Sequence, residues 1–245
     1  MVVVPGITTP AAVIAFAAER LAGAGRDVYV LDMRGRGLSE RAPYGQHRSG
    51  DYAQDVLALI EHVQLERPIL VGHSLGARVV ASARAAVPGC AAAVVAIDPP
   101  VSGPGRRPYP MTLAQFVDGL HEAYAGRAEE DSRKHYPNWS EEQIQARGKW
   151  LSSCDEVAVV ESYAWFHLEA FQPAWAQVDA PALLVYGTES PVVTDADVQE
   201  LQRVNPRAAV AAVPRSGHMV PWDNLDDLVQ QLNDFLAGAD LEVAK

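Results

Sequence analysis

The segment Gly72-His73-Ser74-Leu75-Gly76 has the residue types and spacing that most clearly suggest chemistry in this sequence. A serine between two glycines, directly after an apolar run and before a helix-forming run, is typical of the strand–turn–helix called a nucleophile elbow. Glycines are needed because side chains in so tight a turn would collide with neighbouring backbone. We therefore expect the Ser74 hydroxyl to stand at the start of a helix, where backbone N–H groups favour a developing negative charge.

A serine nucleophile needs a base, and His218 is the candidate among the seven histidines. It lies in Ser216-Gly217-His218-Met219, between the last predicted strand and the final predicted helix. A loop at that point can bring an imidazole back over the ends of the strands. His167 follows Trp165-Phe166 and is a candidate contact for a substrate.

Two carboxylates can serve as the acid that orients this histidine. Asp98 follows the apolar run Ala93–Ile97, and Glu189 follows the run Leu183–Tyr186. Both would emerge at the same sheet edge as Ser74, so both can reach the imidazole. The acid holds the histidine in one tautomer and stabilises the imidazolium that forms during reaction.

The segment Pro5-Gly6-Ile7-Thr8 completes the predicted site. It follows the first apolar run, and its glycine turn would direct the backbone N–H of Ile7 towards the serine. The N–H of Leu75 would lie beside it. Two such donors form an oxyanion hole, which stabilises the tetrahedral intermediate of acyl transfer.

The elements that position these residues alternate between strands and helices. An alternation of this kind predicts an open, mainly parallel α/β sheet with right-handed crossovers and flanking helices. Six short apolar runs are predicted as strands buried on both faces: Val2–Val4, Val28–Met33, Ile69–Gly72, Ala93–Ile97, Leu183–Tyr186 and Ala208–Val213.

The alternation stops in residues 101–180, which contain four of the five tryptophans and no convincing strand. Helical patterns run through Leu113–Tyr124 and Glu141–Leu151. We therefore predict a helical cap over residues 101–180, inserted into a core formed by residues 1–100 and 181–245.

Composition limits the possible partners and compartments. The 245 residues carry a formal net charge of −11, which argues against nucleic acid or an anionic membrane as a partner. The uncharged stretch 2–18 lacks the basic start of a signal peptide. Cys90 and Cys154 lie too far apart for a C-x-x-C motif. We expect a soluble, cytoplasmic protein; the sequence does not indicate its oligomeric state.

The elbow, the histidine loop and the order of elements together resemble the α/β-hydrolase superfamily over essentially the whole chain. A narrower resemblance is to the N-formylmaleamate deformylase group of nicotinic acid degradation. It is carried by Asp98–Arg107, Pro5–Thr8 and Gly217–Asp223. In that group, and in the related hydrolases of vitamin B6 catabolism, the acid follows the strand after the elbow. The resemblance thus implies Asp98 as the acid, with Glu189 as the alternative.

The sequence departs from the superfamily at its start. Pro5-Gly6 replaces the usual His-Gly of the oxyanion loop, in agreement with the deformylases. The antiparallel hairpin that opens the family's sheet is missing, so Val28–Met33 would form an exposed edge strand, which is an aggregation risk. We therefore expect the native chain to begin upstream of Met1.

The resemblance implies a serine hydrolase that cleaves a formamide-type C–N bond of a small dicarboxylate, converting N-formylmaleamate to maleamate and formate. No metal or organic cofactor is implied. Arginine binds carboxylates through a fork of N–H groups, so Arg34, Arg106 and Arg107, with His167, are the predicted contacts for a small anionic substrate. Arg34 and Arg36 can instead brace their own loop. The alternatives are an esterase or carbon–carbon bond hydrolase on the same triad, or a non-catalytic ligand-binding protein.

Overall fold

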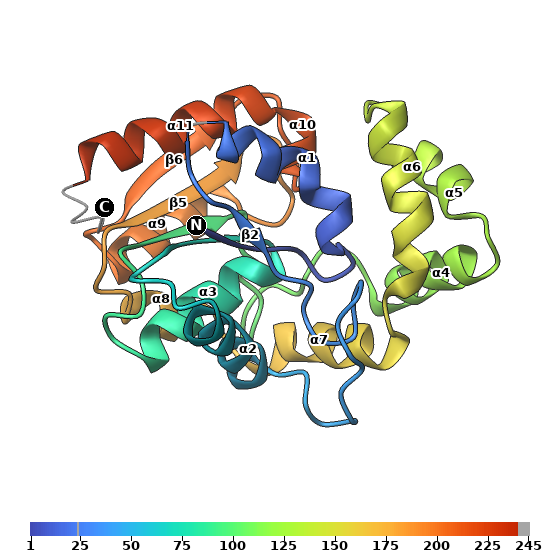
Figure 1. Ribbon diagram of the computed structural model, residues 1–245, viewed down its shortest axis with the longest axis horizontal. Helices are drawn as coiled ribbons and strands as arrows, with labels where there is room; N and C mark the ends of the chain where they lie inside the picture. The colour runs from blue at the N-terminus through green and yellow to red at the C-terminus, as the bar shows by residue number, and fades with distance from the viewer. Residues whose placement is uncertain (24, 240–245) are drawn as a thin grey trace.

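A six-stranded parallel sheet forms the centre of the computed structural model, which describes residues 1–23 and 25–239 (Figure 1). The strand order is β2-β1-β3-β4-β5-β6, and every pairing is parallel. All six predicted strands are present, and the predicted parallel sheet is confirmed. The prediction that every strand is buried on both faces was wrong for the first and the last strand of this order, because they are the edge strands and are partly exposed. The strands are β1 (Val2–Val4), β2 (Tyr29–Val30), β3 (Ile69–His73), β4 (Ala93–Ile97), β5 (Ala182–Gly187) and β6 (Ala209–Val213).

Strand β2 is shorter than the predicted strand Val28–Met33, and that prediction was wrong in length. The chain leaves the sheet because the Asp32 carboxylate accepts the backbone N–H of Ala11 at 2.6 Å and that of Leu38 at 3.0 Å. These bonds tie the chain to the start of the first helix. As predicted, β2 is an edge strand, and among the described residues its one partner is β1.

Helices cover both faces of the sheet because successive strand residues point to opposite sides. Val3 and Val71 pack with α1 and α11 on one face. Val2 and Leu70 pack with α2 and α3 on the other, and Figure 1 shows these two pairs of helices on opposite sides. The flanking helices are α1 (Ala11–Ala22), α2 (Ser49–His62), α3 (Leu75–Ala86), α9 (Asp195–Val204), α10 (Val220–Asp223) and α11 (Leu225–Gly238).

The chain between β4 and β5 is helical. Helix α4 has the bounds predicted for it, and the helix predicted over Glu141–Leu151 is α6 with the first residue of the following 3₁₀ turn. Among the described residues, none of the helices has both the length and the apolar character needed to cross a bilayer. The segment contains α4 (Leu113–Tyr124), α5 (Ala128–His135), α6 (Glu141–Trp150), η1 (Leu151–Ser153), α7 (Glu156–Leu168) and α8 (Gln172–Ala176).

Helices α4, α5 and α6 gather at one end of the molecule, beside α1 (Figure 1). Trp139 and Ile144 join a buried cluster with Val13 of α1, and Trp139 stacks on Trp222 with ring centroids 5.0 Å apart. Helix α8 packs instead against α3 and α9. The division into a core of residues 1–100 and 181–245 and a cap of 101–180 stays a prediction, and residues 240–245 lie outside the described part.

The packing of α11 on the sheet predicts a matched pair of stability effects. Leu232 is fully buried, whereas Leu38 is 84% exposed. We expect Leu232→Ala to lower the free energy of unfolding by about 2–5 kcal/mol, because the substitution leaves a cavity. Leu38→Ala is the control and should change it by less than about 0.5 kcal/mol. Urea unfolding of both variants measures the difference, and equal effects would contradict the packing described here.

Candidate active site

Ser74 lies in the turn between β3 and α3, and this turn has the predicted strand–turn–helix form. Its φ of 56° is in the left-handed region, which costs energy for a residue with a side chain. The flanking glycines are required by close backbone contacts. A Cβ on Gly76 would lie 1.9 Å from the Val4 carbonyl oxygen, and one on Gly72 would lie 2.2 Å from the Gly76 oxygen.

Ser74, His218 and Asp98 form one hydrogen-bonded chain. The Ser74 Oγ is 2.9 Å from His218 Nε2, and His218 Nδ1 is 2.7 Å from Asp98 Oδ2. Ser74 is 2% exposed and Asp98 is fully buried. In this arrangement Nδ1 donates to the carboxylate, which leaves Nε2 free to accept the serine proton. The three residues therefore have the geometry for nucleophilic catalysis.

The structure brings Asp98, and not Glu189, to the histidine. The Asp98 carboxylate also accepts the backbone N–H of Gly187 at 3.2 Å and the hydroxyl of Ser190 at 2.6 Å. These donors compensate the cost of burying a charge. Glu189 is exposed, and its backbone N–H donates to the Ser216 carbonyl. Ser190 could not be predicted from the sequence, because a single serine in a loop belongs to no recognisable motif.

The two predicted oxyanion donors, Ile7 and Leu75, flank the serine. A Cβ on Gly6 would lie 3.5 Å from the Ser74 Cβ, so the turn after β1 passes against the nucleophile. The buried Arg36 donates from Nε to the Ile7 carbonyl at 3.1 Å and thereby fixes that peptide. Arg36 also donates to the Arg34 carbonyl and therefore braces its own loop, which is one of the two roles that the sequence suggests. The assignment of the N–H groups of Ile7 and Leu75 as the oxyanion hole stays a prediction.

His73 binds the backbone of the loop that carries His218. Its Nε2 is 2.8 Å from the His218 carbonyl, and its ring lies 5.8 Å from that of Trp222. Burial, with a smaller contribution from the charge of His218, lowers the pKa of His73 to about 3. His73 is therefore neutral at physiological pH and donates its Nε2–H to the backbone of the histidine loop.

Tyr109 belongs to the site but was missed in the sequence. Its hydroxyl is 3.2 Å from His218 Nε2, and its ring packs against Phe166 at 5.1 Å. Burial, followed by the charge of Asp98, raises the pKa of Tyr109, so its hydroxyl stays protonated. Nothing in Arg107-Pro108-Tyr109-Pro110 indicates this position, because Tyr109 meets His218 across more than a hundred residues of sequence.

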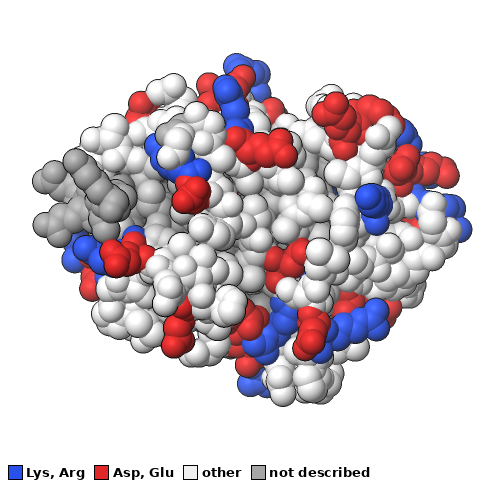
Figure 2. Space-filling view, in the orientation of Figure 1, with Lys and Arg blue, Asp and Glu red and all other residues white. Residues whose placement is uncertain are grey.

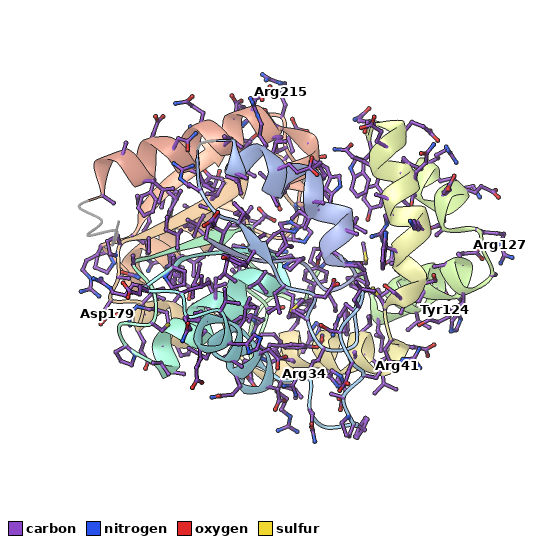
Figure 3. The ribbon with its side chains drawn as sticks, in the orientation of Figure 1. Arg34, Arg41, Tyr124, Arg127, Asp179 and Arg215 are labelled. Carbon is purple, nitrogen blue, oxygen red and sulfur yellow. The ribbon has the colours of Figure 1, made fainter. Side chains whose placement is uncertain are left out.

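The arginines predicted to contact the substrate bind protein groups instead. Arg34 pairs with Asp55 at 2.6 Å, and Figure 3 shows it beside α2 and α7. Arg106 pairs with Glu200 of α9. Their role in substrate binding stays a prediction.

Arg107 and His167 complete the predicted set. Arg107 pairs with Asp197 at 2.9 Å and also donates to the Val192 carbonyl. His167 accepts the Tyr109 backbone N–H through Nε2 at 3.4 Å. Of the four predicted substrate contacts, His167 is thus the one joined to a residue that contacts His218. In the described part of the chain, no group of three His, Cys, Asp or Glu side chains could hold a metal ion.

Comparison with known proteins identifies the family of this chain. The model of a family described as "Alpha/beta hydrolase family" matches residues 1–231. The chain is 40% identical to N-formylmaleamate deformylase of Pseudomonas putida over 96% of its own length and 88% of that protein's. It is 31% identical to 2-(acetamidomethylene)succinate hydrolase of Mesorhizobium japonicum, over 84% of this chain and 77% of that one.

A solved structure of a deformylase has a similar fold. The fold matches the crystal structure of a serine-to-alanine variant of N-formylmaleamic acid deformylase from Pseudomonas putida S16 with a TM-score of 0.89. The two chains are 35% identical, and the match covers 94% of this chain and 90% of the other.

The buried, neutral His73 predicts an acid-dependent loss of stability. The unfolded chain binds this proton below pH 6.5, whereas the folded chain binds it only near pH 3. Acidification through that window therefore favours unfolding, by about 1.4 kcal/mol per pH unit for this one group. We expect the His73→Gln variant to have a lower free energy of unfolding than the wild type at pH 7.5. At pH 5 this difference in the free energy of unfolding should be smaller by about 2 kcal/mol.

Urea unfolding at pH 7.5, 6 and 5 measures this difference between the two proteins. His62→Gln is the control, because His62 is exposed on α2. A gap between His73→Gln and wild type that does not change with pH would show that His73 is not held neutral.

Proposed function

The chain belongs to the alpha/beta hydrolase family, and on that premise we propose that it is a serine hydrolase that cleaves N-formylmaleamate to maleamate and formate. The observation that carries the proposal is the hydrogen-bonded chain Ser74–His218–Asp98. It stands in a protein 40% identical to N-formylmaleamate deformylase.

The proposed substrate has one free carboxylate, and this corrects the expectation of a dicarboxylate. In maleamate one carboxyl group of maleic acid is an amide, and the formyl group is attached to that amide nitrogen. The leaving nitrogen is therefore conjugated with a second carbonyl, which withdraws electrons from it. Such a C–N bond is easier to break than that of a simple formamide.

In the proposed first half-reaction, Ser74 attacks the formyl carbon. His218 Nε2 takes the Oγ proton as the new C–O bond forms, and Asp98 stabilises the resulting imidazolium. The carbonyl oxygen becomes an oxyanion, which accepts hydrogen bonds from the N–H groups of Ile7 and Leu75. The C–N bond then breaks while His218 returns the proton to the nitrogen, and maleamate leaves.

In the second half-reaction, water hydrolyses the formyl ester on Ser74. His218 removes a proton from the water, the hydroxide attacks the formyl carbon, and the C–O bond to Ser74 breaks. Ser74 recovers its proton from His218, and formate leaves. The cycle consumes one water and uses only groups of this chain.

The crowding around Ser74 favours a formyl group over larger acyl groups. Ser74 is 2% exposed, and the Tyr109 hydroxyl lies against the same His218 nitrogen. Formyl is the smallest acyl group. A second candidate is hydrolysis of an acetamide, because the chain is also 31% identical to 2-(acetamidomethylene)succinate hydrolase. Acetate release from that compound, faster than formate release from N-formylmaleamate, would favour the second candidate.

Loss of the nucleophile should abolish turnover. We expect wild-type protein to release formate from N-formylmaleamate and Ser74→Ala to lower kcat by at least about 10⁴-fold. A coupled formate dehydrogenase assay measures the rate, and Ser82→Ala, on a later turn of α3, is the matched control. Absence of formate from the wild-type reaction would refute the proposed activity, and faster turnover of 4-nitrophenyl acetate would indicate an esterase.

The two candidate acids can be separated with isosteric amides. We expect Asp98→Asn to lower kcat by about 10⁴-fold, because the amide cannot hold the histidine tautomer or stabilise the imidazolium. Glu189→Gln should change kcat by less than about 3-fold, since Glu189 is exposed. Formate release by the two purified variants gives the comparison. A collapse of kcat in Glu189→Gln alone would assign the acid to Glu189.

A further inference from the structure

Arg147 on α6 is a buried cation whose hydrogen-bonding capacity is mostly unused. It is 9% exposed, and its guanidinium lies over the ring of Tyr136, 5.5 Å from the centroid. Among the residues that the structure describes, its one side-chain hydrogen bond runs from Nη1 to the Thr8 carbonyl at 3.2 Å. Guanidinium has five N–H donors, so most of them have no acceptor in this part of the chain.

The three arginines that the sequence predicts as substrate contacts have carboxylate partners. Arg34, Arg106 and Arg107 each form an ion pair with an aspartate or glutamate. Within the described residues, no carboxylate lies in ion-pair range of Arg147. A buried charge without a counter-ion is costly, and an anionic ligand would compensate it.

Arg147 lines a cleft of about 410 Å³ that also includes Thr8, whose carbonyl accepts its hydrogen bond. It lies between α4 and the pair α5–α6, and its inner end is formed by Thr8, the residue after the oxyanion donor Ile7. Phe116 also lines it and packs against Tyr109, whose hydroxyl contacts His218. A chain of side-chain contacts thus runs from the cleft through Phe116 and Tyr109 to His218.

The outer rim of the cleft has acidic residues, and Figure 2 shows acidic and basic side chains together over the end of the molecule formed by α5 and α6. Glu122 at this rim is paired with Arg127, which Figure 3 shows at the outer end, and Asp131 is paired with His135. Asp118 is exposed, so solvent screens it. These carboxylates repel anions at the rim, and the attraction for an anion is confined to Arg147 at the inner end.

We propose that Arg147 binds the free carboxylate of the substrate and sets the preference of the enzyme for anionic substrates; this inference rests on the proposed function. The guanidinium fork matches a carboxylate through two parallel hydrogen bonds. Because Arg147 also holds the Thr8 carbonyl, the carboxylate site is tied to the turn that carries Ile7. The separation between bound carboxylate and oxyanion hole is thereby fixed, which orients the formyl carbon towards Ser74.

A pair of activated esters tests this inference independently of the deformylase activity. In the proposed reaction the carboxylate belongs to the leaving group, so the two esters share a small acetyl group and differ only in the leaving group. 3-Acetoxybenzoate carries a carboxylate there, and methyl 3-acetoxybenzoate is neutral. We expect wild type to have the higher kcat/KM for the anionic ester. Arg147→Gln should lower that preference by on the order of 10- to 100-fold, mainly through KM, because a charged hydrogen bond is lost. Arg147→Lys keeps the charge without the guanidinium fork, so its preference for the anionic ester should lie between those of the wild type and Arg147→Gln.

Arg133→Gln is the matched control, because it removes the same charge from the exposed face of α5, where Arg133 pairs with Glu129 and Glu141. It should leave the preference unchanged. Equal losses on both esters in Arg147→Gln would assign Arg147 a structural role and overturn the inference. Loss of the preference in Arg106→Gln or Arg107→Gln, with Arg147→Gln retaining it, would overturn it as well.

The two proposals fail separately. A wild-type enzyme that releases no formate from N-formylmaleamate, yet loses its anionic ester preference in Arg147→Gln, would refute the deformylase and support the carboxylate site. A wild-type enzyme that releases formate but shows equal kcat/KM for both esters would do the reverse.

Discussion

The candidate site depends on the hydrogen bonds that the buried Asp98 carboxylate accepts. A fully desolvated charge is tolerated only when donors surround it. Here those donors come from three parts of the chain: the Gly187 N–H at the end of β5, the Ser190 hydroxyl in the following loop, and the His218 ring. Satisfying one side chain therefore fixes the ends of β4 and β5 and the histidine loop relative to one another.

The electrostatics of the molecule follow from how its arginines are used. The chain has a net charge of −11, and many of its exposed arginines form ion pairs with carboxylates, for example Arg20 with Asp226. Arg78 is buried without an ion pair, but its N–H groups donate to carbonyls such as that of Glu169, and burial lowers its pKa to about 10. Arg147 also has no ion pair among the described residues, but a single carbonyl, that of Thr8, accepts a hydrogen bond from its side chain.

Features that depend on residues close together in the sequence could be predicted, and features that depend on contacts between distant parts of the chain could not. The elbow at Ser74 and the bounds of α4 are local, because tight-turn glycines and the capping residue Thr112 lie within a few positions. The choice between Asp98 and Glu189 is not local, since both leave the same sheet edge. Residues such as Tyr109 and Arg147 act through contacts more than a hundred positions away, which no spacing reveals. The arginines of the strand-end loops were assigned by sequence proximity, but their carboxylate partners come from distant helices.

The near-complete burial of Ser74 has a kinetic consequence. In the proposed reaction a substrate would have to find room beside the Tyr109 hydroxyl, which lies against the same His218 nitrogen as the 2% exposed Ser74. Tyr109 stands between two prolines in a segment that begins after β4 and follows Gly105, whose φ of 71° is in the left-handed region. A displacement of this segment would make that room, and it would then accompany substrate entry and product release. Such gating steps occur on microsecond to millisecond timescales, and they can set the ceiling on turnover even where bond cleavage is fast.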